Sequence, residues 1–449
     1  MQTDMTVGKP MKMILDFTIP VFIGNVFQQF YNMADAIIVG KFVGTKGLAA
    51  VGSTGTIMFL IIGFLMGLTA GFTVLTSQKF GAGKMDEMRQ SVGNAALLSI
   101  IISVIMTAVS MVGMHSLLTL MHTPEDIFQD AYTYIMIICG GIFAQVLYNI
   151  LASILRALGN SKTPLYFLIL AALLNIVLDL TFIIVFHMGV AGAAWATITA
   201  QGVSGVLCLI YIIKCVPELK LKADDWRFRS EIAKKEILVG IPMGLQYSIT
   251  AIGSVILQAS VNTLGSMAVA AVAAGSKVTL FFCCPFDALG GTMATYAGQN
   301  VGAGKLDRIK TGLKSSSIIG CIYAVIAFLI LLFFSDKIAL LFMDAGETET
   351  IRQVSMFLIA NSAFYIPLVF VNVVRFTIQG MGYSTFAILA GVFEMAARGL
   401  AGLVLVPAFG YIAACFGSPL AWIFADIFLF PAFFHCLKTM KRELKEAKQ

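Results

Sequence analysis

The segment QKFGAGKMDEMR at residues 78–89 returns, with the same core, as QNVGAGKLDRIK at residues 299–310. Its Gly-Ala-Gly-Lys core is similar to a phosphate-binding loop, which needs another glycine five residues before the last one and a Ser or Thr after the lysine. Gln78 occupies the first of those positions and Met85 the second. The segment therefore predicts no nucleotide site, and its return later in the chain indicates an internal duplication instead.

Two further pairs of segments support the duplication. VGTKGLAAVG at 43–52 aligns with LGSMAVAAVA at 264–273, and the offset of 221 is the same as that between the two GAGK segments. NILASILRALGNS at 149–161 aligns with NVVRFTIQGMGYS at 372–384, at an offset of 223. We therefore expect two copies of one unit, in which the GAGK segment is a turn. Its glycines end a helix and its lysine marks the cytoplasmic side.

Composition indicates what the unit is made of. The 449 residues are 59% hydrophobic and 12% charged, with a mean hydropathy of +0.90, whereas a soluble protein of this length is about 25% charged. A membrane span needs about 20 apolar residues. We predict an all-α polytopic membrane protein with twelve spans at 11–39, 48–77, 91–115, 127–156, 163–187, 190–215, 236–262, 268–297, 312–334, 350–379, 384–407 and 411–437.

The spans divide into two lobes of six. We predict an N-lobe at 1–217, a cytoplasmic linker with an amphipathic segment at 218–235, and a C-lobe at 236–449. Because six is even, both lobes enter the membrane from the same side, as parallel repeats related by a pseudo-two-fold axis. Lysine and arginine gather in the loops on the side of the linker, so both termini are expected in the cytoplasm. A merely solvated connector is the simpler interpretation of the linker.

Several classes of function lack the residues they require. The eight cysteines form no CxxC pair and the four histidines form no metal-binding cluster, so disulfides and a zinc site are not expected. No nucleophile and base stand together as an intramembrane enzyme would need. The basic residues are dispersed in loops, which does not favour a nucleic-acid partner. The expected partners are the lipid bilayer and small molecules, without a cofactor, and we expect a monomer.

Charged residues within spans are candidates for function, because each is costly to insert. In the first half, Asn25, Gln28, Asn32 and Asp35 share one helical face, as do Asn175 and Asp179, and Thr197 lies on the next span. Two carboxylates among carboxamides and hydroxyls can retain a proton or bind sodium. The alternative is helix-to-helix hydrogen bonding, for which membrane proteins also use Asn and Thr.

The second half carries a different set. Span 7 has a polar, uncharged stripe at Gln246, Thr250, Ser254 and Gln258. Lys277 and Asp287 on span 8 lie about 15 Å apart along a helix, too far to pair. Glu394 and Arg398 have the spacing of an intrahelical ion pair, and Asp426 has no evident role. The candidates for a substrate cavity are Gln28, Asn32, Gln246, Gln258, Lys277 and Asp287.

Four motifs in order carry a resemblance to a known family. Pro20, Asp35, Gly40 and Gly44 precede LAAVG, which is followed by GAGK, then LRALGNSKTP, then an N…LDL…GVAGAAWAT pattern. The chain resembles the multidrug and toxic compound extrusion (MATE) transporters, most closely their bacterial DinF-like branch, over essentially its whole length.

The resemblance implies a bacterial inner-membrane protein that exchanges amphiphilic, often cationic, compounds for H⁺ or Na⁺ by alternating access. It implies a cation site in the N-lobe at Asp35, Asn175, Asp179 and Thr197, with Asn149 as a neighbour. NorM-type members carry an acidic residue in span 7, which this chain lacks, and this difference favours N-lobe coupling. A lipid-linked oligosaccharide flippase of the related superfamily is the alternative.

Overall fold

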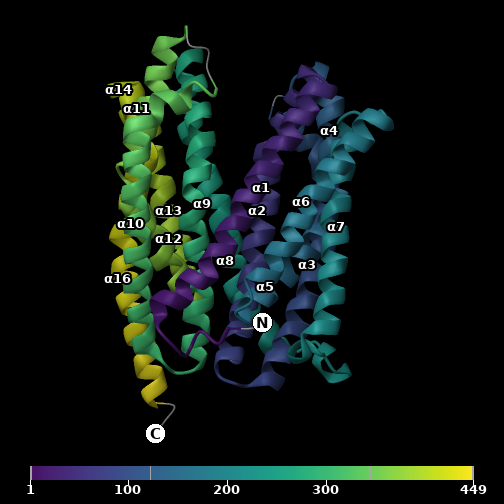
Figure 1. Cartoon of the computed structure of the whole chain (residues 1–449), viewed down its shortest axis with the longest axis vertical. Coiled ribbons are helices and arrows are strands. Elements are labelled where there is room, and N and C mark those ends of the chain that lie inside the picture. Colours follow the sequence, from purple (N-terminus) through teal and green to yellow (C-terminus); the bar gives the residue numbers. More distant parts are fainter. Residues whose placement is uncertain (1–2, 122, 343–345, 447–449) are drawn as a thin grey trace. The chain divides into compact units, whose positions relative to one another are not determined.

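The computed structural model describes residues 3–121, 123–342 and 346–446, and this part of the chain is almost entirely helical and contains no β-strand (Figure 1). Ten of its helices are long and apolar enough to cross a membrane. The helices are α1 Pro10–Phe42, α2 Thr45–Gly81, α3 Met85–Leu120, α4 Glu125–Gly140, α5 Ile142–Ala157, α6 Lys162–Leu180, α7 Val190–Cys215, α8 Ser230–Asn262, α9 Ser266–Gly302, α10 Leu306–Ala339, α11 Thr348–Ser362, α12 Tyr365–Gly380, α13 Ser384–Leu400, α14 Val406–Phe409, α15 Tyr411–Cys415 and α16 Gly417–Glu446.

Two predicted spans are broken helices. The pair α4 and α5 bends by 47°, and the pair α11 and α12 bends by 49°. Counting each pair as one span gives the twelve that the sequence predicts, although spans 4 and 10 are not the continuous helices expected. At the first break, a side chain on Gly141 would collide with Ile198 of α7, so glycine allows the backbone to approach that helix closely.

The chain divides into two compact units. The first comprises the residues up to Asp4 together with Ile23–Gly244, and the second comprises Met5–Phe22 together with the chain from Leu245 onward. Two helices therefore contribute to both units, because α1 and α8 each pass from one unit to the other along their length. Each of these helices contains a proline near the change, Pro20 in α1 and Pro242 in α8.

The duplication extends to the backbone. In the first GAGK segment Gly83 has φ +70°, and the Lys84 N–H donates to the carbonyl of Lys79 at 3.1 Å. In the second, Gly304 has φ +67°, and the Lys305 N–H donates to the carbonyl of Asn300 at 2.9 Å. A left-handed glycine after a helix end is the usual helix stop. The predicted turn is thus formed twice, with the same hydrogen bond.

A second irregularity also recurs. A π-helical stretch, Thr181–Val185, follows α6 in the first unit, and another, Ala401–Leu405, follows α13 in the second. The offset between their first residues nearly equals the offset of the sequence repeat. Because π-helical turns are rare and often lie at functional sites, the first of them directs attention to the end of α6.

Close helix packing joins α2 to the first half of α8 within the first unit. A side chain added to Gly67 would meet the backbone of Met243, and one added to Gly71 would meet the backbone of Gly240. These glycines are the small residues at every fourth position that the sequence offers for close approach. The linker before α8 forms two short 3₁₀ turns, Pro217–Leu219 and Ala223–Trp226.

Candidate functional site

Two carboxyl groups meet inside the first unit. Asp35 lies on α1, and Asp179 lies in the last turn of α6, immediately before the π-helical stretch. The two side chains are within hydrogen-bonding range of each other, and Asp179 is fully buried. Two carboxyl groups at this separation repel when both are ionised, so the contact calls for a shared proton or a bound cation. The Oδ1 atom of each has no hydrogen-bond partner among the described residues.

Asn175 links the pair to α7. In the amide orientation that satisfies both of its partners, Nδ2 of Asn175 donates to Oδ2 of Asp179 at 3.1 Å. Its Oδ1 then accepts from the backbone N–H of Thr197 at 3.3 Å. All three side chains are buried. The structure therefore brings together four of the five residues predicted for the cation site, with three helices contributing them.

Two tyrosines complete the surroundings of the carboxyl pair. Tyr31 lies one turn before Asp35 on α1, and its hydroxyl is within hydrogen-bonding range of Thr197. Tyr134 of α4 is buried and lies near both carboxyl groups. Sequence reasoning missed both, because an isolated tyrosine in an apolar span is ordinary; the spacing of Tyr31 from Asp35 was the one available signal.

Asn149, the fifth residue predicted for the cation site, has no recorded contact with the carboxyl pair among the described residues. Nδ2 of Asn149 donates to the carbonyl of Gln145, one turn earlier on its own helix, at 2.9 Å. On α1, Gln28 is half-buried and Asn32 is exposed. The contact recorded for Asn149 thus stays within α5.

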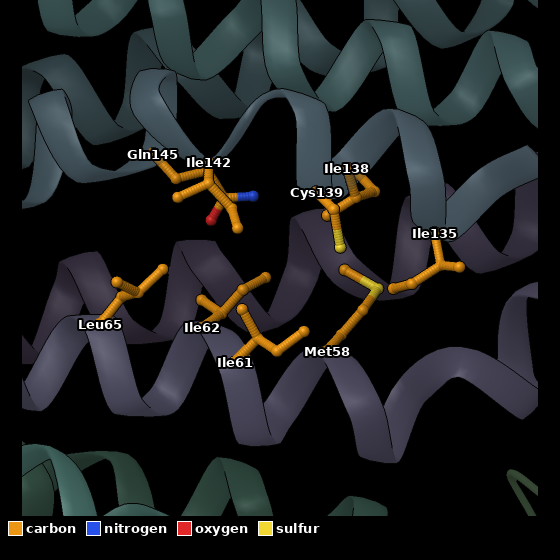
Figure 2. Close-up of a pocket in the computed structure, with 9 residues that line it drawn as sticks. All are labelled: Met58, Ile61, Ile62, Leu65, Ile135, Ile138, Cys139, Ile142 and Gln145. Atoms are coloured by element: carbon orange, nitrogen blue, oxygen red, sulfur yellow. The ribbon is translucent and has the colours of Figure 1, made fainter. Parts of the chain in front are cut away.

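An apolar pocket lies within the first unit, where α2 faces α4 and α5 (Figure 2). The amide of Gln145 contributes a polar group to its wall. The other lining residues are Met58, Ile61, Ile62, Leu65, Ile135, Ile138, Cys139 and Ile142. The volume of the pocket, about 10 Å³, is close to the smallest that admits one water molecule, so it does not hold a substrate in this structure.

The predicted cavity residues of the second unit differ in their burial and contacts. Lys277 and Asp287 are both exposed on α9. Gln246 of α8 is buried and accepts a hydrogen bond from Gln379 of α12. Gln258 is exposed and donates to Asn262, one turn further along α8, at 2.9 Å.

A buried ion network lies in the second unit. The predicted pair on α13 is formed, with Arg398 donating to Glu394 at 3.3 Å. Arg375 of α12 also contacts Glu394, and all three side chains are buried. Asp426 of α16 is buried nearby and interacts electrostatically with Arg375 and Glu394. Sequence reasoning missed Arg375, although it stands within the quoted repeat at 372–384, because no residue at helical spacing pairs with it.

Comparisons with known proteins agree with this architecture. The family model MatE matches residues 20–181 and 242–404. The chain is 33% identical over 308 residues to the probable multidrug resistance protein YpnP of Bacillus subtilis (strain 168), and the aligned residues make up 68% of each chain. It is 23% identical over 367 residues to the probable multidrug resistance protein NorM of Thermotoga maritima, covering 80% of this chain and 77% of the relative.

Solved structures share the fold over nearly the whole length. A crystal structure of a MATE in complex with MaL6 superposes with a TM-score of 0.92 at 23% identity, covering 98% of this chain and 99% of the other. An outward-facing structure of a multidrug resistance MATE family transporter of the MOP superfamily gives a TM-score of 0.91 at 23% identity, covering 98% of each chain. With both halves of the family model matched, the chain belongs to the MatE family of membrane transporters, the multidrug and toxic compound extrusion proteins.

Proposed function

We propose that this protein is a secondary active multidrug efflux transporter that exchanges amphiphilic, often cationic, compounds for H⁺ or Na⁺ by alternating access. The observation that carries the proposal is the contact between the carboxyl groups of Asp35 and Asp179 inside the first unit. With no cationic side chain recorded at this contact among the described residues, the pair needs a proton or a bound cation to be stable.

The surroundings supply oxygen atoms for either cation. Oδ1 of Asp35 and of Asp179 are unpartnered, and the hydroxyl groups of Tyr31 and Thr197 lie beside them. Sodium is a hard cation that prefers oxygen ligands, whereas a proton would bridge the two carboxyl groups directly. Loading with either cation removes the repulsion between the carboxylates. The empty pair is therefore the high-energy state that coupling requires.

Exchange follows if cation and substrate favour different states of the protein. A ligand shifts a conformational equilibrium only by its difference in affinity between the states. Moving one charge through 100 mV is worth about 2.3 kcal/mol, or roughly a fifty-fold gradient. Exchange of one proton for one monovalent cation moves no net charge. We therefore propose that a pH or sodium gradient, rather than voltage, drives export of a monovalent cationic compound.

We further propose the bacterial cytoplasmic membrane as the location, with both chain termini in the cytoplasm. Lys84 and Lys305 at the two GAGK turns, together with the basic linker, support this orientation through the excess of positive charge in cytoplasmic loops. The chemistry invoked needs no cofactor beyond the coupling ion, and a monomer contains the whole proposed site.

The test is substrate efflux from proteoliposomes that contain the full chain, with pH and sodium gradients imposed separately. We expect Asp35→Asn and Asp179→Asn to lose gradient-driven efflux of a cationic dye. Asp16→Asn is the matched control, because Asp16 is exposed on the same helix as Asp35. Correct folding is checked by a monodisperse elution profile. Efflux by Asp35→Asn at the wild-type rate, with the wild-type ion dependence, would refute the site.

A further inference from the structure

A third acidic side chain is buried in the first unit, away from the carboxyl pair. Glu236 lies near the start of α8 and is 0% exposed. The hydroxyl of Ser91 on α3 donates to its Oε1 atom at 2.8 Å, and the hydroxyl of Thr76 on α2 lies 2.9 Å from that of Ser91. Oε2 of Glu236 has no hydrogen-bond partner in the described part of the chain.

No basic side chain compensates this carboxyl group among the residues described. Lys79 of α2 pairs with Glu87, and Arg89 of α3 pairs with Asp86. On its own helix, the charged neighbours Glu231, Lys234 and Lys235 are exposed. Glu236 is thus surrounded by protein, and the polar contact that it makes is the hydrogen bond from Ser91. An isolated buried carboxylate is so costly that such a group takes up a proton or a cation.

The second unit has no polar side chains at the positions that correspond to Glu236, Thr76 and Ser91. Aligned on Pro242 and Pro20, an offset of 222, Glu236 corresponds to Ile14. Ile14 is fully buried in the core of the second unit. At the repeat offset of 221, Ala297 corresponds to Thr76 and Gly312 to Ser91. The corresponding residues of the second unit therefore carry neither a carboxyl nor a hydroxyl group.

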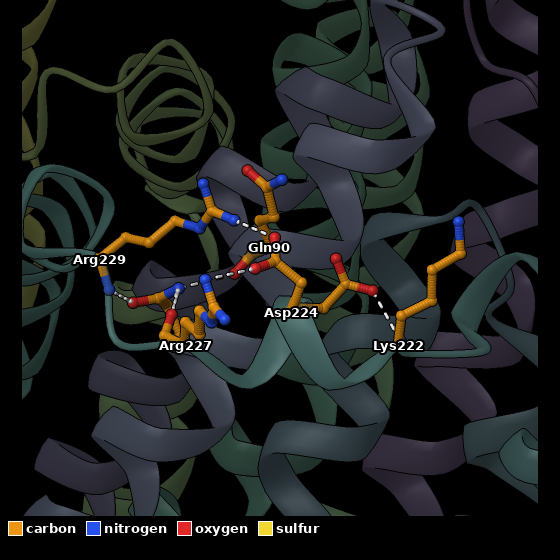
Figure 3. A network of polar contacts seen from close by, with 7 residues as sticks. Gln90, Lys222, Asp224, Arg227 and Arg229 are labelled. Carbon is orange, nitrogen blue, oxygen red and sulfur yellow. Dashed lines mark hydrogen bonds and ion pairs between the residues drawn. The ribbon is translucent and has the colours of Figure 1, made fainter.

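Glu236 also lies where the first half of α8 docks. One turn after Ser91 on α3, Oδ1 of Asn94 accepts from the Arg229 N–H at 2.9 Å, and its Nδ2 donates to the Arg227 carbonyl at 3.4 Å (Figure 3). Arg229 in turn pairs with Asp224 at 2.6 Å. One face of α3 thus holds both the end of the linker and the start of α8.

We propose that Glu236, Ser91 and Thr76 form a proton-binding site, separate from the Asp35–Asp179 pair, that couples protonation to docking of the first half of α8 on α2 and α3. The hydroxyl groups contact each other and the carboxyl group directly, so the hydrogen-bonded chain accommodates a proton without space for a hydrated ion. When Glu236 is protonated, its carboxyl group donates to the hydroxyl of Ser91, and the hydroxyl of Ser91 donates to that of Thr76. An ionised Glu236 is stable only where water reaches it, so loss of the proton favours undocking.

The experiment is an infrared pH titration of the full-length protein in lipid, which records the carbonyl stretch of protonated carboxyl groups. The background variant carries Asp35→Asn and Asp179→Asn, so that the other proposed site does not contribute. Adding Glu236→Gln should remove the signal of one protonated carboxyl group per chain. Adding Glu231→Gln should remove none, because Glu231 is exposed at the start of the same helix.

A second variant tests the hydroxyl partner and does not depend on replacing the acid. Ser91→Ala removes the recorded hydrogen bond to Glu236, so the carbonyl stretch assigned to Glu236 should shift to higher frequency. An unchanged signal in Glu236→Gln, in protein that elutes as a folded monodisperse species, overturns the proposal. A carbonyl stretch of Glu236 that has the same frequency in Ser91→Ala as in the background variant also overturns it. Either outcome leaves the transport proposal for Asp35 and Asp179 unaffected.

Discussion

The buried ion network of the second unit makes a quantitative prediction about stability. Replacing Glu394 by glutamine removes the anion that forms ion pairs with both Arg375 and Arg398 in the described part of the chain, and all three side chains are buried. Removing one partner of a buried ion pair costs about 3–5 kcal/mol, because the remaining charge is left without compensation. We expect Glu394→Gln to lower the free energy of unfolding by about that amount, which is a hundred-fold to several-thousand-fold change in the equilibrium.

The assay is equilibrium unfolding of the purified protein in mixed micelles of increasing denaturing-detergent content. Glu349→Gln is the matched control in the same unit, because its ion pair with Arg352 is exposed, with a separation of 3.5 Å. Loss of an exposed pair should cost less than about 1 kcal/mol. If Glu394→Gln unfolds at the same detergent fraction as the control, the network is not the compensated buried cluster described here.

Three further predictions concern the first unit. Gly71→Ala should destabilise the first unit by about 1–3 kcal/mol, measured by thermal unfolding, because the added methyl group would collide with the backbone of Gly240. Gly55→Ala on the same helix is the control, and it should be neutral or stabilising because the space around Gly55 is open. Tyr31→Phe should weaken binding of the coupling cation about five-fold by removing one hydrogen bond at the site, measured by isothermal titration. Asn94→Ala should expose the linker to limited proteolysis, because it removes two hydrogen bonds between the linker and α3.

Local sequence signals predicted the turns well. The two GAGK segments form the same left-handed glycine turn, because glycine and its position after an apolar run decide that conformation by themselves. The bends within spans 4 and 10 could not be predicted in the same way. Gly141 lies in an apolar run, and the close approach of Ile198 that requires a glycine there involves a residue distant in sequence.

In the candidate sites, too, residues were predictable from local signals and were missed where burial or pairing depends on other helices. Asp35 and Asp179 were predictable because an acid in a span is rare, and the structure places them in contact. Glu236 was missed because it stands at the edge of a span, where an acid is ordinary, and only its neighbours from α2 and α3 reveal its burial. Arg375 was missed because its partner Glu394 lies on another helix.

The two units differ in the contacts that Glu394, Asp179 and Glu236 make. In the second unit, Glu394 is compensated by two guanidinium groups, so it can remain charged while buried. In the first unit, the contacts recorded for Asp179 and Glu236 are with a second acid, an amide and a hydroxyl, none of which is cationic. Uncompensated buried acids must exchange protons or cations whenever their surroundings change, whereas a compensated cluster need not. On the proposed function, Asp35 and Asp179 are therefore the acids that exchange a cation, whereas Glu394 stays paired with its two arginines.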